Sequence, residues 1–466
     1  MTPFQMLRIG VIIFLGVLAG CSSRSADLAA ATRQAGQTPE AALRAQLEPD
    51  AAVKARLSHS GIAGSAFGRA VRTAVLNHPS VQSQDFRVTG ARAAFDSASA
   101  AYAPRLSVGL DAGYSSYASG VSGNRVGPVI SLKKLIYDGA AAKLTQSSRR
   151  EGVALAQLDK IIQSNAIAKR AVETRIGVVR SRSLEKIAGE NLAAHEKLIK
   201  QITSRVNAGA GSEADLLAGK SRLAKARARA IEASRARAQS EAAYFEAYGT
   251  APPAGLTLPP TVPAELRRYK AGAVRRNAKL VRLDFAINQA LFDLAALDAG
   301  RRPALVASLT AGPSVSSSGL SADVTGNLGV RIDLMNGGAR AAKIKQAQAN
   351  ADDLKAQRAQ AEREIVRALS YAKSDATAGA ARVQAAGFAL QAAQAALSTT
   401  KEQFGIGRRS ITQVLDAQRD VSDAAVGAVN AGAGAVLNGY TTLGLTGDLL
   451  LLFGISPAAE AKGDGA

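Results

Sequence analysis

The sequence has few aromatic residues and no tryptophan. Phe, Tyr and Trp together make up 4% of the 466 residues, whereas alanine recurs in almost every segment. A large globular core normally depends on bulky aliphatic and aromatic side chains. Alanine has the highest helix propensity and lets helices approach closely. The composition therefore predicts a long, thin architecture dominated by helices.

Cysteine is almost absent as well, because Cys21 is the only one, and an intramolecular disulfide is excluded. An apolar run from Ile9 to Ala19 precedes it. That run is too short to cross a bilayer but has the length of a signal-peptide core. Residues 18–21, Leu-Ala-Gly-Cys, resemble the bacterial lipobox, in which the cysteine thiol receives a lipid. We predict a lipoprotein signal peptide at 1–20 and lipid attachment at Cys21.

Acidic residues are too few to balance the basic ones, and the formal net charge is +21. Such a charge is typical of proteins that bind nucleic acid or anionic membranes. The Lys and Arg residues are, however, spread along the chain and are not interleaved with aromatic residues, as single-strand binding requires. Zinc-finger, RNA-recognition and P-loop motifs are also missing. We interpret the charge as a solvated surface and predict no nucleic-acid partner.

Signatures of catalysis and of metal binding are missing too. The three histidines, His59, His78 and His195, lie on separate segments without carboxylates or thiols at metal-ligand spacing. There is no Gly-x-Ser-x-Gly elbow, and no Gly-x-Gly-x-x-Gly follows a predicted strand. The sequence predicts that the protein is not an enzyme and holds neither a cofactor nor a metal.

What the sequence does contain is an internal repeat. Residues 205–217 align with residues 403–415, so that Gly209 and Gly407 are 198 residues apart. Asp138-Gly139 matches Asn336-Gly337 at the same offset. Because such landmarks keep their order along almost the whole mature chain, the protein is predicted to be two copies of one unit.

In each copy, the sequence predicts a helix, two runs of alternating apolar and polar residues, a very long helix, a glycine-containing turn and a returning helix. The expected helices cover about 63–103, 139–203 and 212–248, and again about 264–300, 338–402 and 410–445. Ser212 and Ser410 lie where helix N-caps belong. The tip turns contain Gly209, Gly211, Gly405 and Gly407.

The chain is thereby divided into six predicted segments. These are the signal peptide (1–20), an N-terminal extended segment (21–62), the first repeat (63–249, strands about 105–136), a Pro-rich linker (250–263), the second repeat (264–450, strands about 304–335) and a disordered C-terminal tail (451–466).

The long helices carry coiled-coil spacing, with seam positions alternately four and three residues apart, as at Leu144, Ser148, Glu151, Leu155 and Leu158. At ~1.5 Å per residue, such a helix is roughly 100 Å long.

The alternating runs predict strands with one apolar face, because apolar residues occupy every second position. The first run places Leu106, Val108 and Leu110 on one face and Ser107, Gly109 and Asp111 on the other. Two hairpins packed on a soluble domain are one interpretation. The other is membrane strands, which four strands cannot close into a barrel alone, since open edges are not tolerated in lipid. Three chains would supply twelve strands.

The order of these elements resembles the TolC-type outer-membrane efflux family over about residues 63–450. The resemblance also rests on Tyr137-Asp138-Gly139, on Met335-Asn336-Gly337-Gly338 and on the segment Gly407 to Ala417. It implies a mainly α fold with a small β part, assembled as a homotrimer. That homotrimer would form a 12-stranded outer-membrane β-barrel on a long α-helical periplasmic tunnel.

The resemblance also implies a location and partners. The protein would lie in the outer membrane of a Gram-negative bacterium, lipid-anchored and extending into the periplasm. It would be a passive duct that docks to a periplasmic adaptor (membrane fusion) protein and to an inner-membrane ABC or proton-driven transporter.

Gate residues follow from the same resemblance, since the family closes its periplasmic end by links near the two turns. By alignment, Arg409 would meet Asp215, and Phe404 lies where the family often has Tyr, so the hydroxyl of that link is missing. Asp416 falls where an acidic ring can narrow the pore, and Gln413 replaces a second possible acid. The alternative is that the charged residues are solvated charges at helix ends.

Three functions remain open at this stage. The first is a duct for type I protein secretion, favoured slightly because residues 207–216 resemble type I secretion members of the family. The second is a duct for small-molecule (drug or metal) efflux, favoured by the predicted lipid on Cys21. The third is a periplasmic coiled-coil adaptor or scaffold lipoprotein, a class that lacks duplicated membrane-type hairpins.

Overall fold

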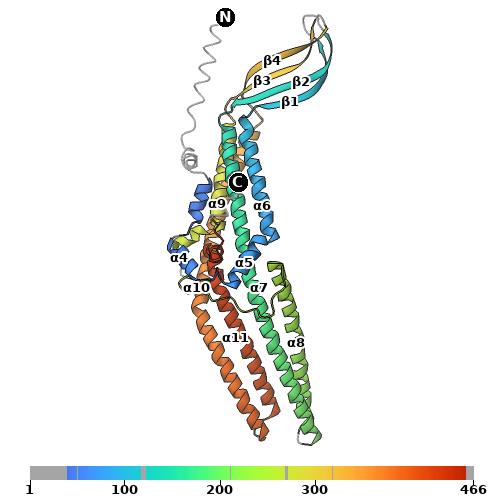
Figure 1. Cartoon of the computed structure of the whole chain (residues 1–466), viewed down its shortest axis with the longest axis vertical. Coiled ribbons are helices and arrows are strands. Elements are labelled where there is room, and N and C mark those ends of the chain that lie inside the picture. The colour runs from blue at the N-terminus through green and yellow to red at the C-terminus, as the bar shows by residue number, and fades with distance from the viewer. Residues whose placement is uncertain are drawn as a thin grey trace. The chain divides into compact units, whose positions relative to one another are not determined.

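The fold is that of a computed structural model, which describes residues 39–49, 51–116, 122–209, 211–267, 271–316 and 319–457. Helices make up most of these residues and four strands form one small sheet (Figure 1). The predicted fold class, mainly α with a small β part, is confirmed. The predicted signal peptide and Cys21 lie outside the described residues.

The chain folds into two units, each built from both repeats. Of the described residues, unit 1 comprises those within 39–43, 87–156 and 282–359, and unit 2 comprises those within 44–86, 157–281 and 360–457. Among the described residues, no helix combines the length and apolar character that a membrane crossing needs.

Unit 1 contains an antiparallel sheet in the order β1-β2-β3-β4. The strands are β1 (Arg105–Ser116), β2 (Ser122–Tyr137), β3 (Ala304–Ser316) and β4 (Gly319–Arg331). The pairing β2–β3 joins the two repeats. Apolar residues face each other across the strands, as in Val108 opposite Ile130 and Ala307 opposite Leu328. The predicted alternation of an apolar and a polar face is therefore present.

The strand pairing extends far toward the hairpin ends. It continues through the Gly/Ser-rich runs after residue 115 and after residue 313, to Ser116–Ser122 and to Ser316–Gly319. Backbone hydrogen bonds hold this ladder, so it does not depend on apolar side chains. β4 ends at Arg331, four residues before the end expected from the alternation.

The two long helices, α7 (Ala141–Asn207) and α10 (Ala339–Gly405), each have 67 residues. Each follows two residues with left-handed backbone, Gly139 and Ala140 (φ 69° and 72°) or Gly337 and Gly338 (φ 61° and 83°). The side chain before each pair caps the helix, because Asp138 Oδ2 accepts from Ala142 N at 2.7 Å and Asn336 Oδ1 accepts from Arg340 N at 3.4 Å. The repeat therefore preserves the whole helix start.

The remaining helices are α5 (Ala66–Asn77), α6 (Pro79–Ser99), α8 (Glu213–Tyr248), α9 (Ala278–Ala299), α11 (Ile411–Thr446), α12 (Leu449–Leu452) and two short 3-10 helices, η1 (Ala100–Tyr102) and η2 (Ala271–Arg276). The single helix expected over 63–103 is divided at Pro79. Proline disfavours helical backbone in the residue before it. His78 is accordingly extended (φ −70°, ψ 128°).

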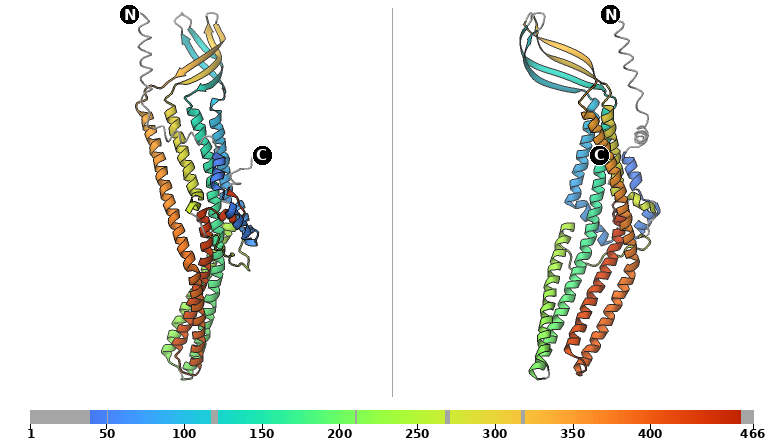
Figure 2. Two further views of the ribbon diagram at one scale, coloured as in Figure 1. Left: turned by 90° about the vertical axis from the view of Figure 1, so that its left-hand side faces the viewer. Right: turned by 180° about the vertical axis from the view of Figure 1, so that it is seen from behind.

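The lower part of Figures 1 and 2 shows two helix pairs, α7 with α8 and α10 with α11. Hydrogen bonds form within the pairs and between them. Arg182 of α7 binds Glu241 of α8, Arg180 of α7 binds Asn430 of α11, and Asn438 of α11 donates to the Ala372 carbonyl of α10.

An aromatic cluster forms the core of the other part of unit 2. The rings of Phe67 and Tyr440 meet edge to face at 5.9 Å, and Phe453 approaches Phe67 at 5.7 Å. Leu452, Phe453 and Ile455 are buried, which corrects the expectation of a disordered tail from residue 451 as far as residue 457. The Leu-rich segment 449–453 supplies apolar side chains that fill this core, and residues 458–466 lie outside the described part.

The segment expected to be extended, residues 21–62, is helical where the structure describes it. It contains α3 (Pro39–Leu47) and α4 (Ala51–His59). Leu43, Leu47 and Leu57 are buried, and they lie on one face of each short helix. The many Ala and Arg residues between them favour helix, which the composition-based expectation of an extended chain missed.

Candidate gate at the helix turns

The two helix turns of unit 2 are built alike. In each, a glycine has left-handed backbone, Gly209 at φ 70° and Gly407 at φ 77°, which side chains rarely adopt. Ser212 then caps α8 by accepting from Ala214 N, and Ser410 caps α11 by accepting from Gln413 N. Gly211 precedes the cap of α8, and Gly405 is the last residue of α10.

Gln413 is engaged by the start of its own helix. Its Oε1 accepts from the Ser410 backbone N–H at 3.0 Å, which completes a capping box with Ser410. A capping box satisfies two free N–H groups at a helix start. Gln413 therefore stabilises the turn at the position where the resemblance places a second acid.

Beside the turns, apolar side chains of three helices form a buried cluster. Leu198 and Ile202 of α7 meet Leu397 of α10 and Ile411, Val414 and Leu415 of α11. Phe404 packs at the edge of this cluster, and the Arg205 guanidinium lies 4.7 Å from the centre of its ring. A cation over an aromatic face is attracted by the ring quadrupole. Phe404 thus links α7 and α10 without the hydroxyl of a Tyr.

Ion pairs join α8 to α11 above this cluster. Arg222 Nη2 lies 2.8 Å from Asp416 Oδ1, and both side chains are partly exposed, at 30% and 43%. One heptad further along both helices, Arg229 Nη1 lies 3.4 Å from Asp423 Oδ1. Arg419 also approaches Asp416, at 3.8 Å. In this conformation the Asp416 carboxylate is therefore largely neutralised by arginine.

Asp416 is among the predicted gate residues, but its partner Arg222 is not. Arg222 and Arg229 are seven residues apart on α8, and Asp416 and Asp423 are seven apart on α11. Opposite charges at heptad spacing on two helices are the signal that could have identified this ladder.

Arg409 and Asp215 both lie at the turns, but no ion pair joins them. Arg409 Nε donates to Gln403 Oε1 at 2.9 Å, across the turn between α10 and α11. Asp215 lies in the first turn of α8, where the helix dipole stabilises a negatively charged carboxylate. Of the five gate candidates, the structure ties Phe404, Gln413 and Asp416 to neighbouring groups and leaves the Arg409–Asp215 link a prediction.

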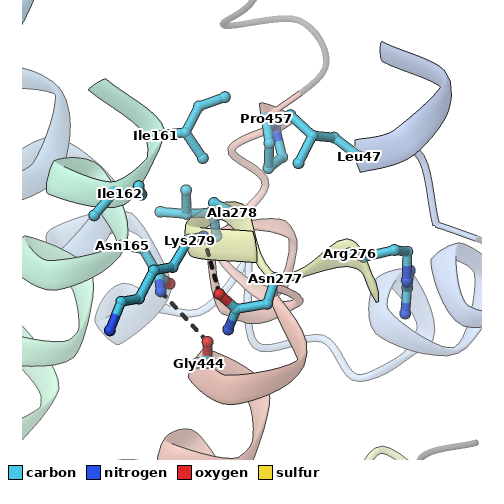
Figure 3. A pocket seen from close by; sticks show the side chains of 12 residues that line it. Leu47, Ile161, Ile162, Asn165, Arg276, Asn277, Ala278, Lys279, Gly444 and Pro457 are labelled. Carbon is cyan, nitrogen blue, oxygen red and sulfur yellow. Dashed lines mark hydrogen bonds between the residues drawn. The ribbon is translucent and has the colours of Figure 1, made fainter. Parts of the chain in front are cut away.

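A separate cavity of about 100 Å³ lies in unit 2 (Figure 3). Asn165 Nδ2 donates to the Gly444 carbonyl at 3.5 Å, and Asn277 Oδ1 accepts from Lys279 N at the start of α9. Its lining contains no carboxylate, histidine or cysteine, so it offers no acid–base pair. Within the described residues, no group of His, Cys, Asp and Glu could hold a metal ion.

Comparison with known proteins gives the family. The sequence profile of the outer membrane efflux protein family matches residues 70–250 and 272–436, which cover most of both repeats. The outer membrane efflux protein BepC of Brucella suis is 25% identical over 334 residues, which are 68% of this chain and 71% of BepC.

Solved structures share the fold. The CmeC outer membrane channel of Campylobacter jejuni is similar with a TM-score of 0.73 at 14% identity, over 82% of this chain and 86% of CmeC. The outer membrane protein VceC of Vibrio cholerae is similar with a TM-score of 0.69 at 16% identity, over 84% of this chain and 96% of VceC. The repeats, the sheet and the matched residues agree, and the chain belongs to the TolC-type outer membrane efflux protein family.

Proposed function

We propose that this chain is the outer-membrane duct of a tripartite export system, formed by three copies that close a twelve-stranded barrel. The observation that carries the proposal is the sheet of unit 1. It has one apolar face, on which Leu110 is 87% and Val108 is 70% exposed. Exposed apolar patches of this kind mark surfaces that contact a partner or a membrane.

The edges of the sheet support an assembly of several copies. β1 and β4 are the outer strands in the order β1-β2-β3-β4, so each presents one unpaired row of backbone groups. In lipid, every backbone polar group needs a partner within the protein. Pairing of β4 with β1 of the next copy satisfies these groups, and three such copies give the twelve strands that a closed barrel can use.

The duct itself has no chemistry, and its cargo comes from its partners. We propose that a periplasmic adaptor protein and an inner-membrane ABC or proton-driven transporter deliver the substrate at the helix turns. A periplasmic adaptor or scaffold role for this chain is disfavoured, because its duplicated hairpins carry an exposed apolar face. Family membership is the second argument against that role.

The experiment that tests the duct is a conductance measurement on the full-length protein in planar bilayers. We expect discrete, long-lived steps of ionic current from the detergent-extracted protein. A matched control deletes residues 105–137 and 304–331, which removes both hairpins, and should give no steps. The absence of steps from the intact protein would overturn the duct.

Two classes of cargo are candidates. Type I polypeptide secretion is supported by residues 207–216, which resemble type I secretion members of the family, and efflux is supported by the name of the Brucella relative, an outer membrane efflux protein. We retain polypeptide secretion as the first. A gene deletion distinguishes them, because it removes a secreted polypeptide from the medium in the first case and raises drug sensitivity in the second.

The proposed gate combines the α8–α11 ion pairs with the Arg409–Asp215 link. These groups are partly or fully exposed, and solvent-accessible pairs contribute at most about 1 kcal/mol each. Opening therefore requires little energy. Asp215→Ala combined with Arg409→Ala should raise the conductance, and an unchanged conductance would remove this link from the gate.

Lipid attachment at Cys21 completes the proposal. The attached lipid would hold the first residues of the mature chain at the membrane. Mass spectrometry of the N-terminal peptide tests it, since a lipidated Cys21 is heavier by its acyl chains. An unmodified cysteine behind an intact signal peptide would rule the anchor out.

A further inference from the structure

We propose that the duct passes anionic solutes in preference to cations, because uncompensated basic side chains line the inner wall of its barrel. The inference rests on the duct proposed above and names the charge of the solutes that it carries. The residues are Arg105, Lys133 and Arg331, which we call the basic belt, and all three are exposed in the single chain.

The basic belt lies on the polar face of the sheet, which is opposite the exposed apolar face. Arg105 is paired directly with Lys133, and Lys133 is paired with Ser308 of β3. Ser308 is paired in turn with Asn327 of β4, and Arg331 lies four residues beyond Asn327 on the same strand. Directly paired residues share a face of a sheet, and so do residues an even number of positions apart on one strand. If the apolar face contacts lipid, the belt faces the lumen.

The basic belt also lies at one end of the sheet, next to the helices (Figure 1). Arg105 is the first residue of β1, Arg331 is the last residue of β4, and Lys133 lies four residues before the end of β2. The two acidic residues of the strands, Asp111 and Asp323, lie toward the hairpin ends. They are six and eight residues from the belt along their own strands, or roughly 20 and 26 Å. The helix end of the polar face therefore carries charge of one sign.

Two other carboxylates follow the strands closely in sequence, and both are already engaged. The Tyr102 hydroxyl donates to Asp138 Oδ1 at 2.7 Å, and Ala142 N donates to Asp138 Oδ2 at 2.7 Å. Asp333 Oδ2 lies 3.2 Å from Arg340 Nη2. Within the described part of the chain, no ion pair joins a residue of the basic belt to a carboxylate. The charge of the belt is therefore not compensated by the chain itself.

Arg105 and Lys133 are a pair of like charges directly opposite each other on neighbouring strands. The Cβ atoms of such a pair are roughly 5 Å apart, and like charges in this arrangement destabilise a sheet. An anion that approaches both side chains offsets their repulsion and accepts charge-assisted hydrogen bonds from them. This part of the wall is therefore more favourable for an anion than for a cation.

Assembly of three copies would bring nine of these side chains, three from each copy, around the lumen. Twelve strands spaced ~4.8 Å apart and tilted by about 40° give a barrel radius of roughly 12 Å. The Debye length is about 10 Å at 0.1 M salt, so the potential of the belt extends to the axis at this salt concentration. A potential of one kT at the axis makes anions about seven times as concentrated as cations there.

The acidic residue of the candidate gate does not oppose this preference. Asp416 Oδ1 lies 2.8 Å from Arg222 Nη2 and 3.8 Å from Arg419 Nη1. Its negative charge is thus compensated by arginine, whereas the positive charge of the basic belt has no such compensation. The excess of basic residues in the whole chain, a formal net charge of +21, has the same sign as the belt.

The test is the zero-current potential of the full-length, detergent-extracted protein in a planar bilayer. The bilayer separates two KCl solutions of different concentration, both at or below about 0.1 M. We expect chloride to be about threefold or more as permeable as potassium. In solutions near 1 M, where the Debye length is about 3 Å, the two permeabilities should become nearly equal.

The variant with Arg105→Gln, Lys133→Gln and Arg331→Gln should lose the preference at low salt. Glutamine keeps these positions polar and removes the like-charge repulsion, so the sheet should still form. The matched control is a pair of single variants, Lys133→Gln and Lys134→Gln, at neighbouring positions of β2 that lie on opposite faces. Lys133→Gln should lower the chloride-to-potassium permeability ratio, and Lys134→Gln should leave it unchanged.

A wild type that gives current steps but passes both ions equally, or prefers potassium at low salt, overturns the basic belt and leaves the duct standing. An unchanged permeability ratio in the triple variant also overturns it, and so does an equal effect of Lys133→Gln and Lys134→Gln. A wild type without current steps overturns the duct itself, and the belt with it.

Discussion

Ala140 shows how the duplication leaves a residue under strain. Among the described residues it is the non-glycine residue with left-handed backbone (φ 72°), and its counterpart in the second repeat is Gly338 (φ 83°). For a residue with a Cβ, this backbone costs roughly 1–2 kcal/mol. The first repeat therefore tolerates alanine where the second has the residue that the turn favours.

We expect Ala140→Gly to stabilise the protein by about 1 kcal/mol, because glycine adopts this backbone without strain. The strain energy that is relieved exceeds the cost of the greater conformational entropy of glycine in the unfolded chain. Thermal unfolding followed by circular dichroism measures it. Ala141→Gly, inside α7, is the matched control and should lower stability. A lower melting temperature for Ala140→Gly would contradict the strain argument.

Glu151 is a buried carboxyl in unit 1, on α7. It is 6% exposed, and its Oε2 has no hydrogen-bond partner. Burial raises the pKa of Glu151 from 4.5 to about 7, against a smaller opposing effect of Arg150. Its folded pKa lies above its unfolded value, so the folded state binds the proton more tightly. Its contribution to stability is thus present below pH 4.5 and is lost as pH rises to about 7.

Glu151→Gln should therefore be close to neutral at pH 5 and stabilising at pH 8, on the order of 2–3 kcal/mol from the pKa difference. Melting temperatures of both proteins at the two pH values test this. Equal pH dependence of wild type and variant would show that Glu151 is solvated in the assembled protein.

At the scale of elements, the long helices and the turns could be predicted from the sequence, because the repeat supplies each landmark twice. α7 and α10 begin and end within a few residues of the expected limits. The break at Pro79 and the buried segment around Phe453 were not predicted. The break depends on a single residue, and the burial depends on tertiary packing. A short apolar run has the same sequence pattern whether it is buried or exposed.

The site was predictable only in part. The caps Ser212 and Ser410 follow from local sequence, and both are confirmed. The partner of Asp416 depends on which helices are neighbours, and local sequence does not show that α8 lies near α11. Arg222 could therefore not be predicted from local sequence.

The C-terminal element is expected to contribute strongly to stability. Phe453 is fully buried and stacks with Tyr440 at 6.3 Å. Phe453→Ala should lower stability by about 3–5 kcal/mol, since it removes a buried ring and leaves a cavity. Phe86→Ala, at a ring that is 77% exposed, is the matched control and should have a small effect. Equal melting temperatures would mean that the tail is not part of the core.

We expect the ion pairs between α8 and α11 to affect the conductance of the channel. Asp416→Ala with Asp423→Ala removes both carboxylates and leaves the arginines of α8 without these partners. Because exposed pairs contribute at most about 1 kcal/mol each, folding should be nearly unchanged. Single-channel conductance should rise if the ladder holds the turns together. Asp352→Ala with Asp353→Ala, outside the ladder, is the control, and equal conductance in both variants would contradict the role.

At the scale of the whole molecule, two features of the sheet favour association with other copies. The sheet has two outer strands that are unpaired within the chain, and its apolar face is exposed. A monomer would leave both features exposed. Assembly of several copies pairs the outer strands, and we expect this pairing to be lost if the copies separate.

The mass of the detergent-extracted, full-length protein tests this account most directly. Native mass spectrometry after removal of detergent should give one species of three chains, each near the 47.9 kDa of the full sequence less its signal peptide. The oligomer should persist in Phe86→Ala and dissociate when both hairpins, residues 105–137 and 304–331, are deleted. A wild-type protein that is monomeric at all concentrations, with both hairpins cleaved by added protease, would contradict the account.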